Sequence, residues 1–275
     1  ARLDTPHRTR MDPRTLPARA GLDWLRDALR LFRRQAFAFT ALVILYLFGL
    51  MLLASVPLAG LAVAALLVPF GTLGLTAAGR EAEANRPPLP ALLLEGFRNP
   101  AARLPLARLG LLQAGLMLLV NLVVGLLAAD AVERWTVVDG QIDPASLMQN
   151  IPWDALLAGA LLYVPALMAT WYSPMLIGWT GMPVGKAVFY SFFACWRNRG
   201  AFIVLGLLLF GLIAAAAMLL GQLLALLGLR GATASLLMTP LALVMSSIAY
   251  ATLWPMWRSV FGAAAPAAAI EAPRE

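Results

Sequence analysis

The chain has 275 residues, 61% of them apolar, and a mean hydropathy of +0.79. These values exclude an ordinary soluble domain and are typical of an integral membrane protein. The net charge of +7 and the isoelectric point near 10.5 would suggest a nucleic-acid partner in a soluble protein. Here the basic residues lie beside apolar runs, so we predict no nucleic-acid partner. With one histidine, His7, and one cysteine, Cys195, we also predict no disulfide, metal site or other cofactor.

Residues 1–20 are polar and basic and contain Pro13 and Pro17, so we predict a flexible N-terminal tail. We expect no cleavable signal peptide in this polar start. Apolar residues then recur at helical spacing at Leu22, Leu25, Leu29 and Phe32. This pattern predicts an amphipathic helix along the cytoplasmic membrane interface.

Six apolar runs follow, and each approaches the roughly 20 residues that cross a bilayer. They cover about 36–55, 58–79, 104–128, 155–180, 201–228 and 235–257. We therefore predict an all-α integral membrane protein whose six-span membrane domain covers residues 21–262. The Ala- and Pro-rich segment 263–275 is predicted to be a disordered tail.

Basic residues fix the predicted orientation of these spans. Alternate crossing places residues 1–35, 80–103, 181–200 and 258–275 on one side. That side holds 19 of the 21 Lys and Arg residues if Arg108 is counted with it, which leaves Arg134 and Arg230 opposite. Short basic loops stay in the cytoplasm. We therefore predict a multi-pass membrane protein with both termini cytoplasmic.

A short motif occurs three times, each time just before an odd-numbered span. Its three copies are Phe32-Arg33-Arg34, Phe97-Arg98-Asn99 and Trp196-Arg197-Asn198. The chain therefore reads as three helical hairpins, each preceded by a cytoplasmic interfacial helix. Aromatic and arginine side chains gather at any membrane interface. The alternative is a collar that binds lipid headgroups or an anionic partner through Arg33, Arg34, Arg98, Asn99, Arg197 and Asn198.

Proline also repeats, at Pro69, Pro174 and Pro255, toward the cytoplasmic ends of the second, fourth and sixth spans. Proline frees a backbone carbonyl and bends a helix, so we predict bends at these positions. Such bends either splay the helices or open a cavity at that depth.

No ionisable residue lies in the middle of a span, although burying such a group is usual along a transport path or proton relay. The intramembrane polar candidates are Gln113, Asn121 and Gln222, with Ser246 and Ser247. Interhelical hydrogen bonds are the simplest role for them, and lining a polar cavity is the alternative.

Catalytic signatures are missing, because the single histidine lies in a tail and no phosphate-binding Gly-rich loop occurs. We predict no catalytic residue, and expect a protein that is not an enzyme. Glu81, Glu83 and Glu95 lie beside arginines and are interpreted as charge balance.

Three stretches resemble recurring segments of an uncharacterised family of proteobacterial inner-membrane proteins, known by a locus tag without an assigned function. They are Arg14–Gly21 with Trp24 and Leu31–Arg34, then Phe192–Asn198, then Trp257–Phe261. The resemblance covers most of residues 11–262 and implies a six-span inner-membrane protein, without an activity or a site. Ten residues precede Met11 in addition, which leaves the start codon open.

These observations predict a non-enzymatic membrane protein that acts through lipids, anionic ones above all, or through other membrane proteins in a larger complex. Accessory subunit, assembly factor and organiser are the roles that fit. A transporter or channel for a small or lipidic solute is the alternative, and it would need a continuous polar lumen.

Overall fold

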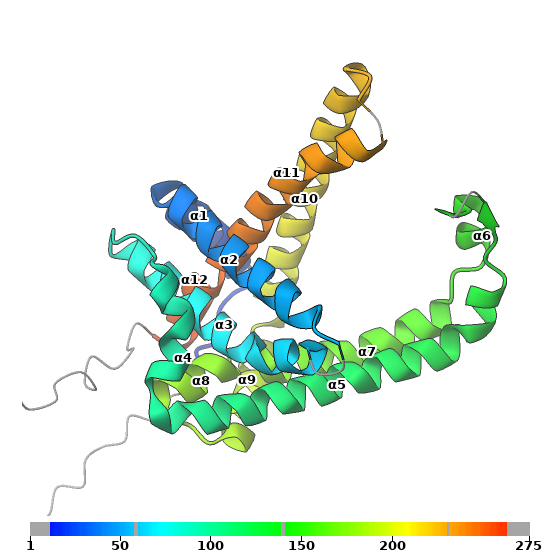
Figure 1. Cartoon of the computed structure of the whole chain (residues 1–275). Helices are drawn as coiled ribbons and strands as arrows, with labels where there is room; N and C mark the ends of the chain where they lie inside the picture. The colour runs from blue at the N-terminus through cyan, green and yellow to red at the C-terminus, as the bar shows by residue number, and fades with distance from the viewer. Residues whose placement is uncertain (1–11, 58–59, 139–140, 230, 263–275) are drawn as a thin grey trace, which may run out of the picture.

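The computed structural model describes residues 12–57, 60–138, 141–229 and 231–262, and Figure 1 shows its course. The helices and strands in chain order are α1 (Ala20–Arg34), α2 (Ala36–Ala54), α3 (Gly60–Glu83), η1 (Pro90–Leu94), α4 (Glu95–Arg98), α5 (Pro100–Glu133), β1 (Val137–Val138), β2 (Gln141–Ile142), α6 (Pro144–Gln149), α7 (Trp153–Trp171), α8 (Ser173–Thr180), α9 (Val184–Arg197), α10 (Arg199–Leu226), α11 (Gly231–Ala251) and α12 (Leu253–Phe261). The strands β1 and β2 form one short antiparallel pair.

The predicted all-α membrane class is confirmed. Six helical stretches in the described residues are long and apolar enough to cross a membrane, and they match the six apolar runs of the sequence. The third stretch is longer than predicted, because α5 runs for 34 residues. The fourth consists of α7 and α8, and the sixth of α11 and α12.

Consecutive long helices pack against each other as α2 with α3, α5 with α7, and α10 with α11. The short helices α1, α4 and α9 come directly before the first member of each pair. One residue separates each short helix from the long helix after it: Gln35, Asn99 or Asn198. The thrice-repeated motif therefore lies at three helix–helix corners.

Figure 1 shows two pairs of helices, α5 with α7 and α10 with α11, diverging from a common region. We call this region the base and define it as α1, α3, α4, α8, α9 and α12. Its core contains the fully buried side chains of Trp24, Leu73, Tyr172 and Trp257. We call the two diverging pairs the arms. Far from the base their apolar side chains are exposed, as at Leu126 and Leu226.

The helix breaks of the fourth and sixth stretches lie close to predicted proline bends. Tyr172 separates α7 from α8 two residues before Pro174, and Thr252 separates α11 from α12 three residues before Pro255. Pro69 instead lies inside the continuous helix α3. A proline in the sequence therefore coincides with an interrupted helix at two of the three positions.

Ser191 of α9 stabilises the break between α7 and α8. Its hydroxyl accepts a hydrogen bond from the Tyr172 amide (2.9 Å) and donates one to the Met168 carbonyl (2.7 Å). In an uninterrupted helix that amide would bond to that carbonyl directly. The hydroxyl is thus inserted into the helical hydrogen-bond series, which is a recognised cause of a kink.

The N-terminal segment differs from the expected tail. Arg14 donates its backbone N–H to the Val260 carbonyl (2.9 Å), and Leu16 donates its N–H to the Asn198 side chain (2.8 Å). Pro13 is buried. The contacts of the membrane domain therefore begin before residue 20, the predicted boundary. Residues 1–11 and the predicted tail 263–275 lie outside the described residues.

Candidate functional site

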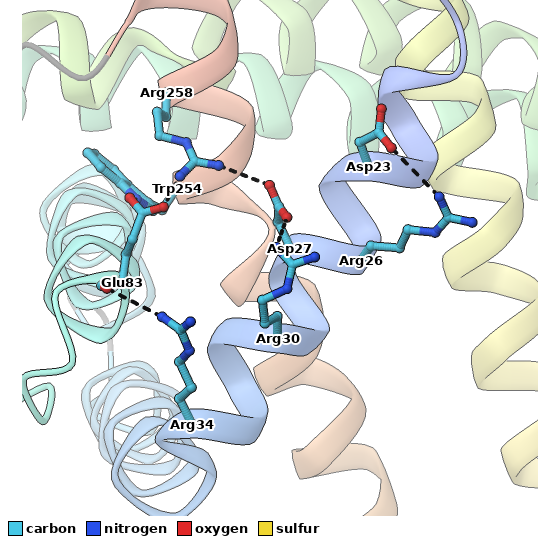
Figure 2. A network of polar contacts seen from close by, with 8 residues as sticks. All are labelled: Asp23, Arg26, Asp27, Arg30, Arg34, Glu83, Trp254 and Arg258. Carbon is cyan, nitrogen blue, oxygen red and sulfur yellow. Dashed lines mark hydrogen bonds and ion pairs between the residues drawn. The ribbon is translucent and has the colours of Figure 1, made fainter.

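Segments that were predicted to share one side of the membrane come together in the structure. Arg258 of α12 pairs with Asp27 of α1 (2.9 Å) and with Glu83 of α3. Asp27 also pairs with Arg30 (2.7 Å), and Arg34 approaches the Glu83 carbonyl, as Figure 2 shows. Four stretches far apart in sequence make up this region, which we call the basic layer: 12–34, 80–108, 181–199 and 258–262.

Two glutamates of the basic layer accept hydrogen bonds from buried indoles. The Nε1 of Trp254 donates to Glu83 (2.7 Å), and the Nε1 of Trp179 donates to Glu95 (2.6 Å). Arg80 pairs with Glu95 (3.3 Å) and lies over the Trp179 ring, 5.2 Å from its centroid. These carboxylates are thus anchors for the aromatic core as well as charge balance.

Sequence analysis missed this role because the partners are distant in the chain. Glu95 and Trp179 are 84 residues apart, and Glu83 and Trp254 are 171 residues apart. The only signal was the requirement that a buried indole N–H finds an acceptor. That requirement does not identify which acceptor it finds.

Positive charge remains in excess after these pairs form. All six described carboxylates of the basic layer lie within 4.0 Å of an arginine nitrogen. Fifteen basic residues are described there, and nine of them make no ion pair with a described residue: Arg14, Arg19, Arg33, Arg34, Arg98, Arg103, Arg108, Lys186 and Arg199.

The predicted arginine collar falls into two groups of residues. Arg33, Arg34, Arg98 and Arg197 are exposed at the ends of α1, α4 and α9. Arg197 bonds to the Thr15 hydroxyl (2.8 Å), but 46% of its side chain is still exposed. No hydrogen bond or ion pair in the described part of the chain links one corner motif to another. The arginines are separate cations on one layer.

The side chains of the two collar asparagines form hydrogen bonds within the protein. Asn99 is the N-cap of α5, since its side chain accepts from the Ala101 N–H (3.1 Å). Asn198 is 1% exposed, and its amide bonds to the Ala194 carbonyl, the Arg14 carbonyl and the Leu16 N–H. The Asn198 amide is therefore not exposed to a lipid headgroup. Instead it binds the N-terminal segment to the corner between α9 and α10.

Helix α9 presents aromatic and basic side chains on its outer face. Its small residues Ala187, Ser191, Ala194 and Cys195 are buried, whereas Phe189, Phe193 and Trp196 are exposed. Lys186 lies over the Tyr190 ring at 5.6 Å, and Arg199 lies over the Trp196 ring at 5.4 Å. Exposed aromatic rings beside cations are typical of a protein surface at the depth of lipid headgroups.

The three predicted intramembrane polar residues do not come together. Gln113 of α5 lines a cavity in the region where the arms diverge. Asn121 is exposed on the same helix and donates to its own Met117 carbonyl (2.8 Å). Gln222 is exposed on α10, in the other arm. Within the described segments, no cluster of three His, Cys, Asp or Glu residues is arranged to hold a metal ion.

Comparison with known proteins gives one informative relative. The chain is 33% identical over 260 residues to a protein of Burkholderia thailandensis described as "Probable inner membrane protein BTH_II0599". The match covers 91% of this chain and 94% of that protein. No protein-family model and no solved structure matches the chain. The chain is thus a multi-pass inner-membrane protein, and it belongs to the same family as this uncharacterised Burkholderia protein.

Proposed function

We propose that the protein is a non-enzymatic inner-membrane protein that acts through lipids, and that its basic layer binds anionic headgroups. The observation that carries this proposal is the charge excess of the layer, where every described carboxylate is paired and nine basic residues are not. We place this layer and both termini on the cytoplasmic side, because 19 of the 21 basic residues belong to that side.

The magnitude of the electrostatic attraction supports the proposal. A basic residue near an anionic membrane surface contributes roughly 1 kcal/mol. Paired arginines contribute less, since their charge is already compensated by a carboxylate. The exposed aromatic face of α9 adds apolar contact at the same depth. Together these features favour a surface that gathers anionic lipid around the base.

The main test compares two arginine triples that remove the same charge. Arg33→Gln, Arg98→Gln and Arg199→Gln together remove one exposed and unpaired cation from each of the three corners, since Arg197 is paired with Asp12. Arg26→Gln, Arg30→Gln and Arg86→Gln remove three arginines that are also exposed but already paired. Each protein is extracted with its bilayer patch, and mass spectrometry gives the ratio of retained phosphatidylglycerol to phosphatidylethanolamine.

We expect the corner triple to reduce phosphatidylglycerol enrichment by about tenfold, which corresponds to about 1.4 kcal/mol. The paired triple should reduce it less, although Asp23 loses its arginine partner and Asp27 and Glu81 each lose one of two. Equal reductions would contradict the proposal, because net charge alone would then explain binding. A stoichiometric protein in place of enriched lipid would make this chain an accessory subunit instead.

The alternative of a transporter has weaker geometric support. A transport path requires polar groups that continue across the membrane. Gln113 lines a cavity, but Asn121 and Gln222 are exposed and do not line it. Of these, Gln113 alone lines a described cavity. The geometry of the basic layer therefore favours interaction with lipid over transport.

A further inference from the structure

A cavity of about 370 Å³ lies between α3, α5, α7 and α11, and it is partly open to the outside. This volume falls within the range of small-molecule sites. Leu167 and Thr170 line it from α7, and Ser246, Ala249 and Tyr250 line it from α11. The cavity thus lies between both helices of one arm, α5 and α7, and helix α11 of the other arm.

The cavity is distinct from the basic layer. Its residue on α3, Thr72, is eight positions before Arg80, which corresponds to about 12 Å along the helix axis. No Lys, Arg, His, Asp or Glu is among its lining residues. The site therefore lies toward the bilayer interior and carries no charge to balance a charged ligand.

Polar groups in the cavity wall differ in whether they already have partners. Thr72 donates to the Val68 carbonyl (3.0 Å), and Thr170 donates to the Ala166 carbonyl (2.9 Å), each within its own helix. The side chains of Gln113, Ser246 and Tyr250 make no hydrogen bond with any residue the structure describes. The buried indole N–H of Trp171, another lining residue, also lacks a partner, so four polar groups of the described residues are unpaired around one space.

Unpaired polar groups at this depth are costly, because the hydrocarbon region offers no water to satisfy them. Asn121, two turns further along α5, satisfies its amide with its own Met117 carbonyl. Gln113 does not, and an amide offers both donors and an acceptor. The remaining wall, from Leu167, Pro174, Ala249 and Leu253, is apolar.

We infer that this cavity binds an uncharged amphipathic lipid from the bilayer, with a hydroxyl or ester group at Gln113, Ser246 and Tyr250 and its chain along the apolar wall. A neutral glycerolipid such as diacylglycerol has this chemistry. The inference goes beyond headgroup binding at the basic layer, and it stands if that proposal fails, since it uses different residues and a different lipid.

The test uses a diacylglycerol that carries a diazirine in one acyl chain, with the protein reconstituted in phosphatidylcholine nanodiscs. After photolysis, peptide mapping locates the cross-links. We expect them to concentrate on residues 167–174 and 246–253. Unlabelled diacylglycerol should compete for the site, whereas hexadecane and phosphatidylglycerol should not.

Two variants on different helices examine the site itself. Gln113→Leu should lower the competable cross-linking about tenfold, as expected for a loss of about 1.4 kcal/mol. The matched control Asn121→Leu, on the same helix, should leave it unchanged. Ala249→Phe fills the space from α11 and should abolish it, so the test does not depend on the folding of the Gln113 variant.

Three outcomes would overturn the inference. Cross-links spread evenly along α5 and α10 would indicate surrounding lipid only. Equal yields from Gln113→Leu and Asn121→Leu would remove the role of Gln113. Competition by phosphatidylglycerol as strong as that by diacylglycerol would contradict the requirement for an uncharged lipid.

Discussion

The base and the arms of this protein are stabilised in different ways. In α3, which belongs to the base, 56% of the most apolar stretch is buried in the protein. In α5 and α10, one helix of each arm, only 6% of the corresponding stretch is buried, and the stretches that contain α7 and α11 are 28% buried. The base thus contains packed aromatic rings and ion pairs, whereas the arms expose apolar side chains on most of their surface.

The difference in burial follows from what surrounds each region. Lipid tails are as apolar as leucine, so no hydrophobic force drives two helices together inside a bilayer. The arms can therefore remain apart with lipid around them. The base includes polar backbone at helix ends and corners, and these groups need partners within the protein. Substitutions should consequently matter far more in the base than in the arms.

The lone cysteine provides a measurement for this comparison. Cys195 is buried in α9, and burial raises the pKa of its thiol above its ordinary value. A protonated, buried thiol reacts slowly with alkylating reagents. Its labelling rate in nanodiscs therefore reports how often the base opens, and ratios of rates between variants give changes in opening free energy.

The largest expected effect comes from Gly21 of α1, where two helices approach closely. A Cβ atom at this position would lie 2.2 Å from the Ala201 carbonyl oxygen of α10, and backbone atoms cannot rotate away. Gly21→Ala should destabilise the base by about 3 kcal/mol through overpacking. Cys195 labelling should accelerate roughly a hundredfold.

Gly206 supplies the matched control on α10, because nothing lies within 4 Å of the position that a Cβ atom would occupy there. Gly206→Ala should be neutral or stabilising by up to about 1 kcal/mol, as alanine favours the helix. Gly21→Ala alone should therefore accelerate Cys195 labelling, whereas Gly206→Ala should leave the rate unchanged or lower it. A similar change in both would contradict the division into base and arms.

A smaller effect is expected at Ser191, whose hydroxyl joins α9 to the break between α7 and α8. Ser191→Ala leaves the buried Tyr172 N–H and Met168 carbonyl without this partner, so we expect a loss of about 1–3 kcal/mol. Ser235→Ala in the arm removes only a hydroxyl that bonds to its own Gly231 carbonyl, and should change stability by less than about 0.5 kcal/mol. Equal labelling rates in these two variants would show that the inserted hydroxyl does not hold the break.

The class of fold was readable from the sequence, because six apolar runs and one-sided arginines are local patterns. The three corners could be predicted only in part. The repeated motif marked their positions, but the headgroup role assigned to Asn198 ignored a partner segment 182 residues away. The cavity around Gln113 depends on four helices meeting, and a linear pattern of isolated polar residues does not specify which of them remain unpaired.

The smallest effect separates charge from hydrogen bonding at Glu83, which receives both Arg258 and the Trp254 indole. Glu83→Gln retains an oxygen for the indole and loses the ion pair. Because the Glu83 side chain is 35% exposed, we expect a cost of only about 0.5–1 kcal/mol. Glu83→Leu loses both contacts and should cost about 2 kcal/mol.

Glu133→Gln and Glu133→Leu, on the exposed end of α5, are the control and should leave Cys195 labelling unchanged. Added salt should reduce the ion-pair share alone. If Glu83→Leu matched Glu83→Gln, the indole hydrogen bond would contribute nothing, and Glu83 would stabilise the base through its charge alone.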